Sequence, residues 1–281
     1  NRSLAELQRG FDNHPPHTIR RYYLWETASG QTIAYAIYGI RDLPEHQDAY
    51  LICKVHPDHR PGTLEADILT WCEQEIYTLH PQATLWLNAR IDRTHYTTLY
   101  ENLGYQPVRW FHQMSRSLLT PIESPQFPSG FVPRTCQGDA DIHPWVDMFN
   151  NTFFDSWNFQ PITVETRRHR IQRPTYQRDL DWILLAPDDT FAAFCDARIN
   201  HKRNGRTGRQ EGWINILGTR RGYRRQGLGR AMLLLGLQQL QQAAMETALL
   251  GVDSQNSNQA QTLYESVGFQ PIHTTISYTK P

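Results

Sequence analysis

Residues 217 to 231 read LGTRRGYRRQGLGRA, and they join the end of an expected strand to the start of an expected helix. The run before them, 213 to 217, has strand character, whereas Leu228, Met232, Leu235 and Leu240 recur at roughly helical spacing. At a helix start the backbone N–H groups have no partner within the helix and the macrodipole is positive. The stretch therefore predicts a site where a pyrophosphate can bind without a dedicated side chain.

Glycines and arginines in this stretch strengthen the prediction of an anion site. Gly227 and Gly229 let the backbone approach an anion closely and tolerate positive φ. Arg224, Arg225 and Arg230 can donate charge-assisted hydrogen bonds to phosphate oxygens. A surface turn with solvated arginines has much the same composition, so the loop alone leaves both interpretations open. Neither a Walker loop nor a Rossmann fingerprint is present.

The sequence downstream of the loop carries a more specific pattern. Arg-x-x-Gly-x-Gly at 224 to 229 is followed by VDSQN at 252 to 256, by Ala260 and by LYESVGF at 263 to 269. This combination resembles the GNAT superfamily of acyl-CoA-dependent N-acyltransferases. With LGT at 217 to 219 and GVD at 251 to 253, it is most similar to the mycothiol synthase-like branch. The resemblance covers residues 131 to 281.

The resemblance implies a fold, a co-substrate and a set of contacts. The fold is α/β, with a mixed, mostly antiparallel central sheet flanked by helices in each of two tandem domains. The co-substrate is acetyl-CoA, and no metal is expected. The residues expected to bind acetyl-CoA are Leu217, Gly218, Thr219, Arg224, Arg225, Gln226, Gly227, Leu228, Gly229, Arg230, Asn256 and Ala260.

Acyl transfer to an amine needs an acid for the leaving thiolate, donors for the oxyanion and a route for the amine proton. Tyr264 matches the family's general acid, and a phenol with a pKa of about 10 is protonated at neutral pH; a core aromatic is the alternative. A free backbone N–H near Leu217 or Gly218 would stabilise the oxyanion. Glu211 is the candidate base, directly or through water, with a solvated turn residue as the alternative and Asp196 as a weaker candidate.

The acceptor is expected to meet the segment FDSWNFQP at 154 to 161. Asp155 beside Trp157 and Phe159 could hold a cationic amine, and a capped helix end that packs its tryptophan is the alternative. The expected reaction moves an acetyl group to a primary amine of a small molecule by direct attack in a ternary complex. Acetylation of a protein N-terminus, and a CoA-binding sensor without turnover, remain open alternatives.

The chain contains the same unit twice. LYENLGYQP at 99 to 107 repeats LYESVGFQP at 263 to 271. Arg60 precedes Tyr100 by 40 positions, as Arg224 precedes Tyr264. Such a repeat predicts two tandem copies of one fold.

In this register the first copy loses the features of an anion site. Thr63 falls on Gly227 and restricts the backbone, while Glu65 falls on Gly229 and puts a negative charge at the helix start. Tyr96 falls on Ala260 and would crowd the co-substrate. We therefore expect the first domain to be a degenerate copy with a scaffolding role.

Composition shifts and hydrophobic periodicity divide the chain. The expected domains are 1–119, possibly truncated at its start, and 131–281, with a Pro-rich linker at 120–130 between them. The segment 202 to 209 is expected to be a basic, solvated loop. The remaining elements are expected as strands at 20–26, 32–40, 49–55, 84–87, 131–135, 181–185 and 191–199, and as helices around 64–76, 139–154 and 163–171.

Charge and cysteine content narrow the class of protein. Lys plus Arg equals Asp plus Glu, 28 each, so no basic field favours nucleic acid or a membrane surface. No apolar run reaches the length of a membrane span, and the expected location is cytoplasmic. Four scattered cysteines predict buried, reduced thiols. Cys53, His56 and His59 have zinc-like spacing but lack a second pair, so no metal is predicted. The oligomeric state stays open.

Overall fold

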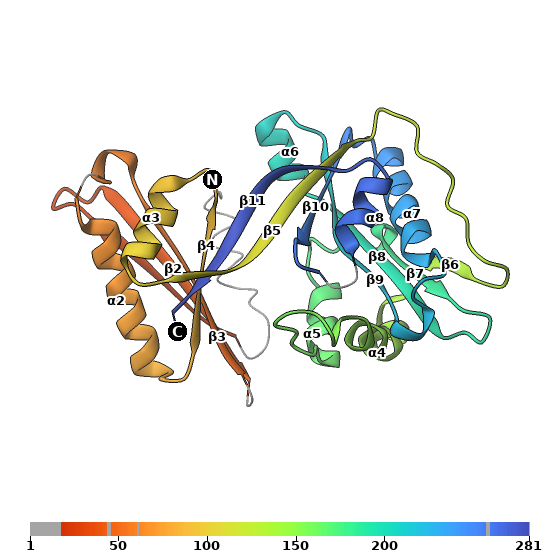
Figure 1. Cartoon of the computed structure of the whole chain (residues 1–281), viewed down its shortest axis with the longest axis horizontal. Coiled ribbons are helices and arrows are strands. Elements are labelled where there is room, and N and C mark those ends of the chain that lie inside the picture. The colour runs from red at the N-terminus through yellow and green to blue at the C-terminus, as the bar shows by residue number, and fades with distance from the viewer. Residues whose placement is uncertain (1–17, 44–45, 61, 257–258, 281) are drawn as a thin grey trace. The chain divides into compact units, whose positions relative to one another are not determined.

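The computed structural model describes residues 18–43, 46–60, 62–256 and 259–280, which divide into two units (Figure 1). Unit 1 comprises the described residues up to Phe111 and those from His273 onward. Unit 2 comprises His112–Ile272. Each unit has its own hydrophobic core and its own strands and helices.

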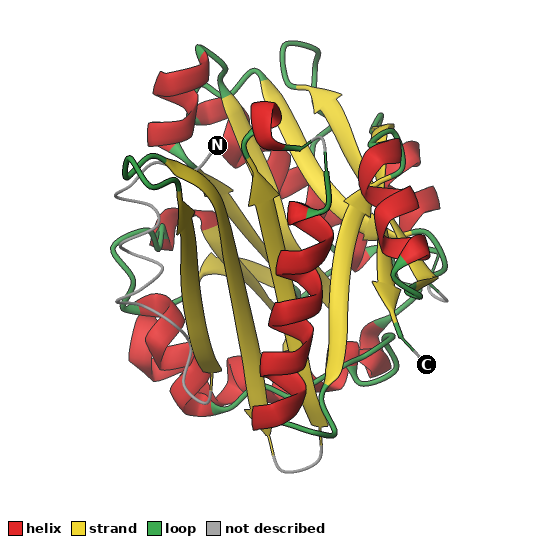
Figure 2. Cartoon of the chain, turned by 90° about the vertical axis from the view of Figure 1, so that its left-hand side faces the viewer, coloured by secondary structure: helices red, strands yellow, loops and turns green. Residues whose placement is uncertain are grey.

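Up to Asn102, the described residues of unit 1 form four strands and two α-helices. Its elements are β1 (Thr18–Glu26), β2 (Thr32–Leu43), β3 (His46–Val55), α2 (Leu64–Leu79), β4 (Thr84–Arg90) and α3 (Thr94–Asn102). The first three strands are antiparallel neighbours, and β3 pairs with β4 in parallel. Along β2, Ala34, Ala36, Tyr38 and Ile40 alternate into the core, where α2 packs against the sheet. Figure 2 turns this side toward the viewer and shows a helix lying along the strands.

Unit 2 contains a mixed sheet with helices on both faces. Its strands run in the order β10-β9-β8-β7-β6, and only β9 and β10 pair in parallel. The strands are β6 (Val132–Thr135), β7 (Asp181–Leu185), β8 (Phe191–Ile199), β9 (Glu211–Thr219) and β10 (Thr247–Asp253). The helices are α4 (Ile142–Phe153), α5 (Val164–Ile171), α6 (His201–Thr207), α7 (Leu228–Gln242) and α8 (Ala260–Ser266).

Close packing fixes which helix covers which face of this sheet. A Cβ on Gly236 of α7 would lie 2.5 Å from the Cys195 sulfur, and one on Gly218 would lie 2.6 Å from Thr152 of α4. Because successive strand residues point to opposite faces, Cys195 faces α7, whereas Phe194 faces α4 and contacts Trp145. The glycines allow both helices to pack closely on the strands.

Two strands pass from one unit into the other along the chain. β5 (Gln106–Ser117) begins in unit 1 and ends in unit 2, and β11 (Gln270–Thr279) runs the opposite way. In unit 1, Ile276 of β11 lies opposite Ala89 of β4 and is buried. In unit 2, Met114 of β5 is fully buried in the core. The units therefore divide within these strands, whereas the sequence places 120–130 in a linker and the whole of 131–281 in one domain.

Most expected elements match those of the structure, and the α/β class with a sheet flanked by helices is confirmed. The expectation of a basic loop at 202–209 is wrong, because His201–Thr207 forms α6. Asn200 caps this helix by accepting from the Arg203 N–H, and Gly208 ends it in the left-handed conformation. The two capping residues thus stabilise α6 by more than the interior Gly205 destabilises it.

Cysteines and helix lengths give two further observations. All four cysteines are free and buried, as expected for reduced thiols. Within the described ranges, no helix combines the length and hydropathy needed to span a membrane.

Candidate functional site

The neighbouring strands β9 and β10 separate at the carboxyl end of the unit 2 sheet. Their parallel pairing joins Glu211–Trp213 to Thr247–Leu249, although β9 continues to Thr219 and β10 to Asp253. The other edge of β9 stays paired with β8 as far as Thr219. Beyond Trp213, the described pairing therefore leaves one edge of β9 outside the ladder, with backbone donors and acceptors available to a ligand.

A β-bulge contributes to this separation. Ile214 lies opposite Ala197 and Ile216 opposite Asp196, so Asn215 is the extra residue on β9. Its side chain donates to the Asp196 carboxylate at 2.8 Å. Bulges bend a strand and increase its twist, and this one lies just after Trp213, where the pairing of β9 with β10 ends.

The start of α7 lies at the end of β9 and has the features of an anion site. Gly227 is its N-cap residue, with φ of 78°, and no side chain caps the helix. The first N–H groups of α7 are therefore available to an anion. Gln226 is exposed, whereas Leu228 is buried in the core and offers only its backbone. A Cβ on Gly229 would lie 3.3 Å from the Thr219 hydroxyl, so only glycine leaves this approach open.

The arginines of the loop have partners that the sequence could not show. Arg224 forms an ion pair with Asp155 at 2.7 and 3.0 Å and also donates to the Thr152 carbonyl oxygen at 2.6 Å. The Arg224 guanidinium is the main cause that holds the pKa of Asp155 below its usual value. The sequence predicts that Asp155 holds an amine and that Arg224 binds a phosphate. In the structure, the two side chains bind each other.

Two more contacts anchor the loop to α4. Arg220 pairs with Asp147 at 2.7 Å, and the Arg221 N–H donates to the Asn151 side-chain oxygen at 3.1 Å. Both α4 residues are separated from the loop by about 70 positions, so this anchoring depends on the tertiary fold. It holds the backbone of the loop beside the start of α7.

The other two predicted arginines differ from each other. Arg230 donates to both oxygens of Glu123 at 2.9 Å, although this pair is partly exposed to water. Arg225 is exposed and has a left-handed backbone with φ of 65°. Among the three arginines, Arg225 alone forms no ion pair within the described part of the chain.

The structure brings α8 to the same place. A Cβ on Gly229 would lie 3.6 Å from Leu263, the residue before Tyr264. Tyr264 is 9% exposed and packs edge-on against Phe269, with 6.1 Å between the ring centroids. Burial raises the pKa of the Tyr264 phenol, so it is protonated at neutral pH. Asn256 lies three residues after the end of β10, and Ala260, half-buried, begins α8.

Glu211 does not lie with these residues. It begins β9, six residues before Leu217, which corresponds to about 20 Å of strand. Its carboxylate forms ion pairs with Arg209 at 3.2 Å and with Arg203 at 3.7 Å. The assignment of Glu211 as a base is therefore not supported by its position.

The predicted acceptor segment is partly exposed. Trp157 is 38% exposed, Phe159 is half-buried, and Asn158 between them has a left-handed backbone. Sequence reasoning missed Thr152, whose methyl group lies against Gly218 and whose buried hydroxyl has no hydrogen-bond partner in the described structure. A threonine in the middle of an amphipathic helix gives no signal that it contacts a strand end.

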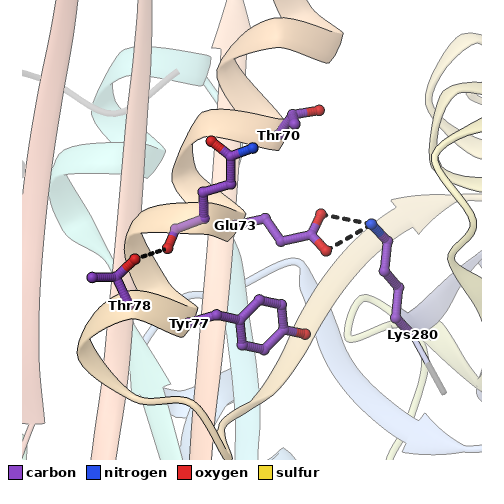
Figure 3. Close-up of a pocket in the computed structure, with 6 residues that line it drawn as sticks. Thr70, Glu73, Tyr77, Thr78 and Lys280 are labelled. Carbon is purple, nitrogen blue, oxygen red and sulfur yellow. Dashed lines mark hydrogen bonds and ion pairs between the residues drawn. The ribbon is translucent and has the colours of Figure 1, made fainter.

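A hollow of about 450 Å³ lies in unit 1 (Figure 3). It is lined by Thr70, Glu73, Gln74, Tyr77 and Thr78 of α2, together with Lys280, and the Lys280 ammonium lies 2.7 Å from both oxygens of Glu73. None of its lining residues belongs to the predicted site. In the residues that the structure describes, no group of three His, Cys, Asp or Glu side chains gathers as metal ligands.

Comparisons with known proteins find similar acetyltransferases. Residues 142–269 match the model of the acetyltransferase (GNAT) family. A mycothiol acetyltransferase of Frankia casuarinae is 25% identical over 257 residues, covering 89% of this chain and 72% of that protein. A protein of the same name from Thermobispora bispora is 28% identical over 182 residues, and the match covers 65% of this chain and 61% of that protein.

Solved structures show the same fold. A GCN5-related N-acetyltransferase of Sphaerobacter thermophilus superposes with a TM-score of 0.79 at 22% identity, covering 100% of this chain and 86% of that one. A tandem GNAT protein from the clavulanic acid biosynthesis pathway superposes with a TM-score of 0.74 at 12% identity, covering 97% and 86%. At these identities the likeness concerns the fold.

Proposed function

The chain carries an acetyltransferase domain of the GNAT family and is an acyltransferase, and we propose that unit 2 transfers an acetyl group from acetyl-CoA to a primary amine of a small molecule. The observation that carries this proposal is the separation of β9 from β10 beside the uncapped start of α7. The mycothiol acetyltransferases to which the chain is similar support a small-molecule acceptor.

Two neighbouring features suit two parts of acetyl-CoA, its pyrophosphate and its pantetheine arm. The N–H groups at the start of α7, together with Arg225, would bind the pyrophosphate. The free edge of β9 at Leu217 and Thr219 would pair with the amide groups of the pantetheine arm. Thr219 lies close to Gly229, which links the two parts of the site. Asn256 and Ala260 would contact the same arm from the side of β10 and α8.

Three groups then serve the reaction. The amine attacks the thioester carbonyl carbon directly, and a backbone N–H at Leu217 or Gly218 stabilises the resulting oxyanion. Tyr264, whose pKa burial raises further above neutral pH, donates its proton to the departing thiolate. Water removes the proton from the amine, since Glu211 lies at the far end of β9. Unit 1 has no part in turnover.

Calorimetric titration with acetyl-CoA tests the proposal first. We expect one site per chain, and release of free thiol once a suitable amine is added. Binding without thiol release for any amine in a broad panel would instead describe a CoA sensor. Two sites would contradict the assignment to unit 2 alone, and the absence of binding would contradict the proposal as a whole.

A further inference from the structure

Two arginines of α5 lie three positions apart and therefore share a face of the helix. Arg167 is 2% exposed, forms an ion pair with Asp181 and stacks on the Trp145 ring, 3.7 Å from its centroid. Arg170 is half-buried, with its guanidinium 5.8 Å from the centroid of the Phe149 ring. Among the residues that the structure describes, no carboxylate lies within ion-pair distance of Arg170. Within the described residues, Arg167 thus has a carboxylate partner and Arg170 has none.

The surroundings of Arg170 carry an excess of positive charge. Burial, then Arg198 and Arg167, lowers the pKa of Arg170 to about 10. The carboxylate of Asp196 is nearby, but it already accepts from Arg198 at 2.9 Å and from Asn215 at 2.8 Å. A charge withdrawn from water is costly unless it is paired. An anion bound beside Arg170 would remove this cost.

The position of Arg170 relates it to the proposed reaction centre. Asp196, with which it interacts, lies opposite Ile216, directly before Leu217. Asp196 and Phe194 point to the same face of β8, the face that α4 covers. Arg170 lies over the ring of Phe149 of α4, which in turn lies 6.1 Å from the Phe194 ring, so it stands on the α4 face of the sheet and not on the α7 face.

We propose that the acceptor amine also carries an anionic group, a carboxylate or a phosphate, and that Arg170 binds it. The inference rests on the proposed function, because it concerns the second substrate of the same site. A guanidinium suits this role, since it can donate two parallel hydrogen bonds to a carboxylate or phosphate. Asp196 accepts from both Arg198 and Asn215, which leaves Arg170 available to the ligand.

Matched acceptor pairs test the inference. Phenylalanine is compared with phenylalaninamide, and glucosamine 6-phosphate with glucosamine, by thiol release from acetyl-CoA. In at least one pair, the anionic member should have a kcat/KM about 10- to 100-fold higher, mostly through KM. Arg170→Gln should remove this preference, and Arg170→Lys should retain part of it. Arg168→Gln, at an exposed position of the same helix, is the control and should keep the preference.

The outcomes separate this inference from the proposal on which it rests. Equal rates within every pair, or a preference that survives Arg170→Gln, would overturn the role of Arg170. Thiol release with neutral amines alone would do the same and leave the proposed function intact. No thiol release from any amine would overturn both. Circular dichroism of each variant shows whether it is folded, and the Lys variant supplies the test if the Gln variant is not.

Discussion

The start of α2 in unit 1 and the start of α7 in unit 2 occupy the same place in the repeat but differ in charge. A 3-10 turn precedes each helix, Pro57–His59 in unit 1 and Arg221–Tyr223 in unit 2. Where unit 2 has Gly229, unit 1 has Glu65, a carboxylate only 3% exposed and 2.6 Å from the His95 ring nitrogen. Unit 1 thus carries its own negative charge where unit 2 would bind a phosphate.

A second residue of unit 1 is also larger than its counterpart in the predicted site of unit 2. Tyr96 stands where unit 2 has Ala260, with the Lys54 ammonium 4.1 Å from its ring centroid. Burial and the nearby Glu65 raise the pKa of Tyr96 to about 12. β3 and β4 nevertheless pair in parallel only between Asp48–Tyr50 and Thr84–Trp86, much as β9 and β10 do. The pairing pattern is therefore common to both units, and the proposed difference in ligand binding rests on a few side chains.

Tyr264 and Tyr100 give the largest expected contrast between the units. We expect Tyr264→Phe to lower kcat by about 10²- to 10⁴-fold, because the leaving thiolate loses its acid. Acetyl-CoA affinity, measured by calorimetry, should change little, since the ring and its packing on Phe269 remain. Tyr100→Phe is the matched control in unit 1 and should leave kcat unchanged. Equal loss in both variants would show that the two tyrosines act through stability.

Gly229→Glu copies the unit 1 residue into unit 2. We expect acetyl-CoA affinity to fall by about 100-fold, because the carboxylate would compete with phosphate at the helix start. Gly229→Gln has the same size without the charge and should lose less. Thermal unfolding checks for strain, since a Cβ would lie 3.3 Å from Thr219. Glu65→Gln should leave both affinity and stoichiometry unchanged; a weaker site after this change would contradict the assignment.

Asp155→Asn tests a smaller difference between the units. Arg224 pairs with Asp155, whereas Arg60, its counterpart, donates to the Val55 carbonyl oxygen instead. Because Arg224 lowers the pKa of Asp155, the pair stabilises unit 2 above the unfolded pKa of about 4, and this contribution is lost as pH falls further. Urea unfolding at pH 7 should show a cost of at most about 1 kcal/mol. The same difference at pH 3 would argue against an ion pair.

Local signals in the sequence predicted the frame but not the partners of its charged groups. The glycines at 227 and 229 are explained by the backbone conformation at a helix start. Both the glycines and the helix start can be recognised within one continuous stretch of sequence. Arg224 and Asp155 are 69 positions apart, and no local pattern connects them. The same holds for Arg230 and Glu123, which are 107 positions apart. Ion pairs of this kind depend on the tertiary fold, so separate roles were assigned to residues that bind each other.

The bulge at Asn215 and the burial of Thr152 were invisible for a related reason. A bulge is a mismatch between two strands, and β9 alone reads as a regular strand. Glu211 was proposed as a base because it precedes the co-substrate strand, but strand rise places it at the far end. The position of Glu211 along its strand could have been taken into account from the sequence alone. The pairing of β9 with β8 could not.

The two strands that pass between the units make the chain hard to divide. A fragment starting at residue 131 omits Met114 and Leu118, which are buried in the unit 2 core. A fragment ending at residue 119 omits Ile276 and Tyr278, which are buried in the unit 1 core. Each unit thus takes part of its core from sequence that lies outside the boundaries predicted for its domain. Under the proposed function, selection for a folded, active unit 2 also preserves the strands of unit 1, whereas the residues of unit 1 that correspond to the site can diverge.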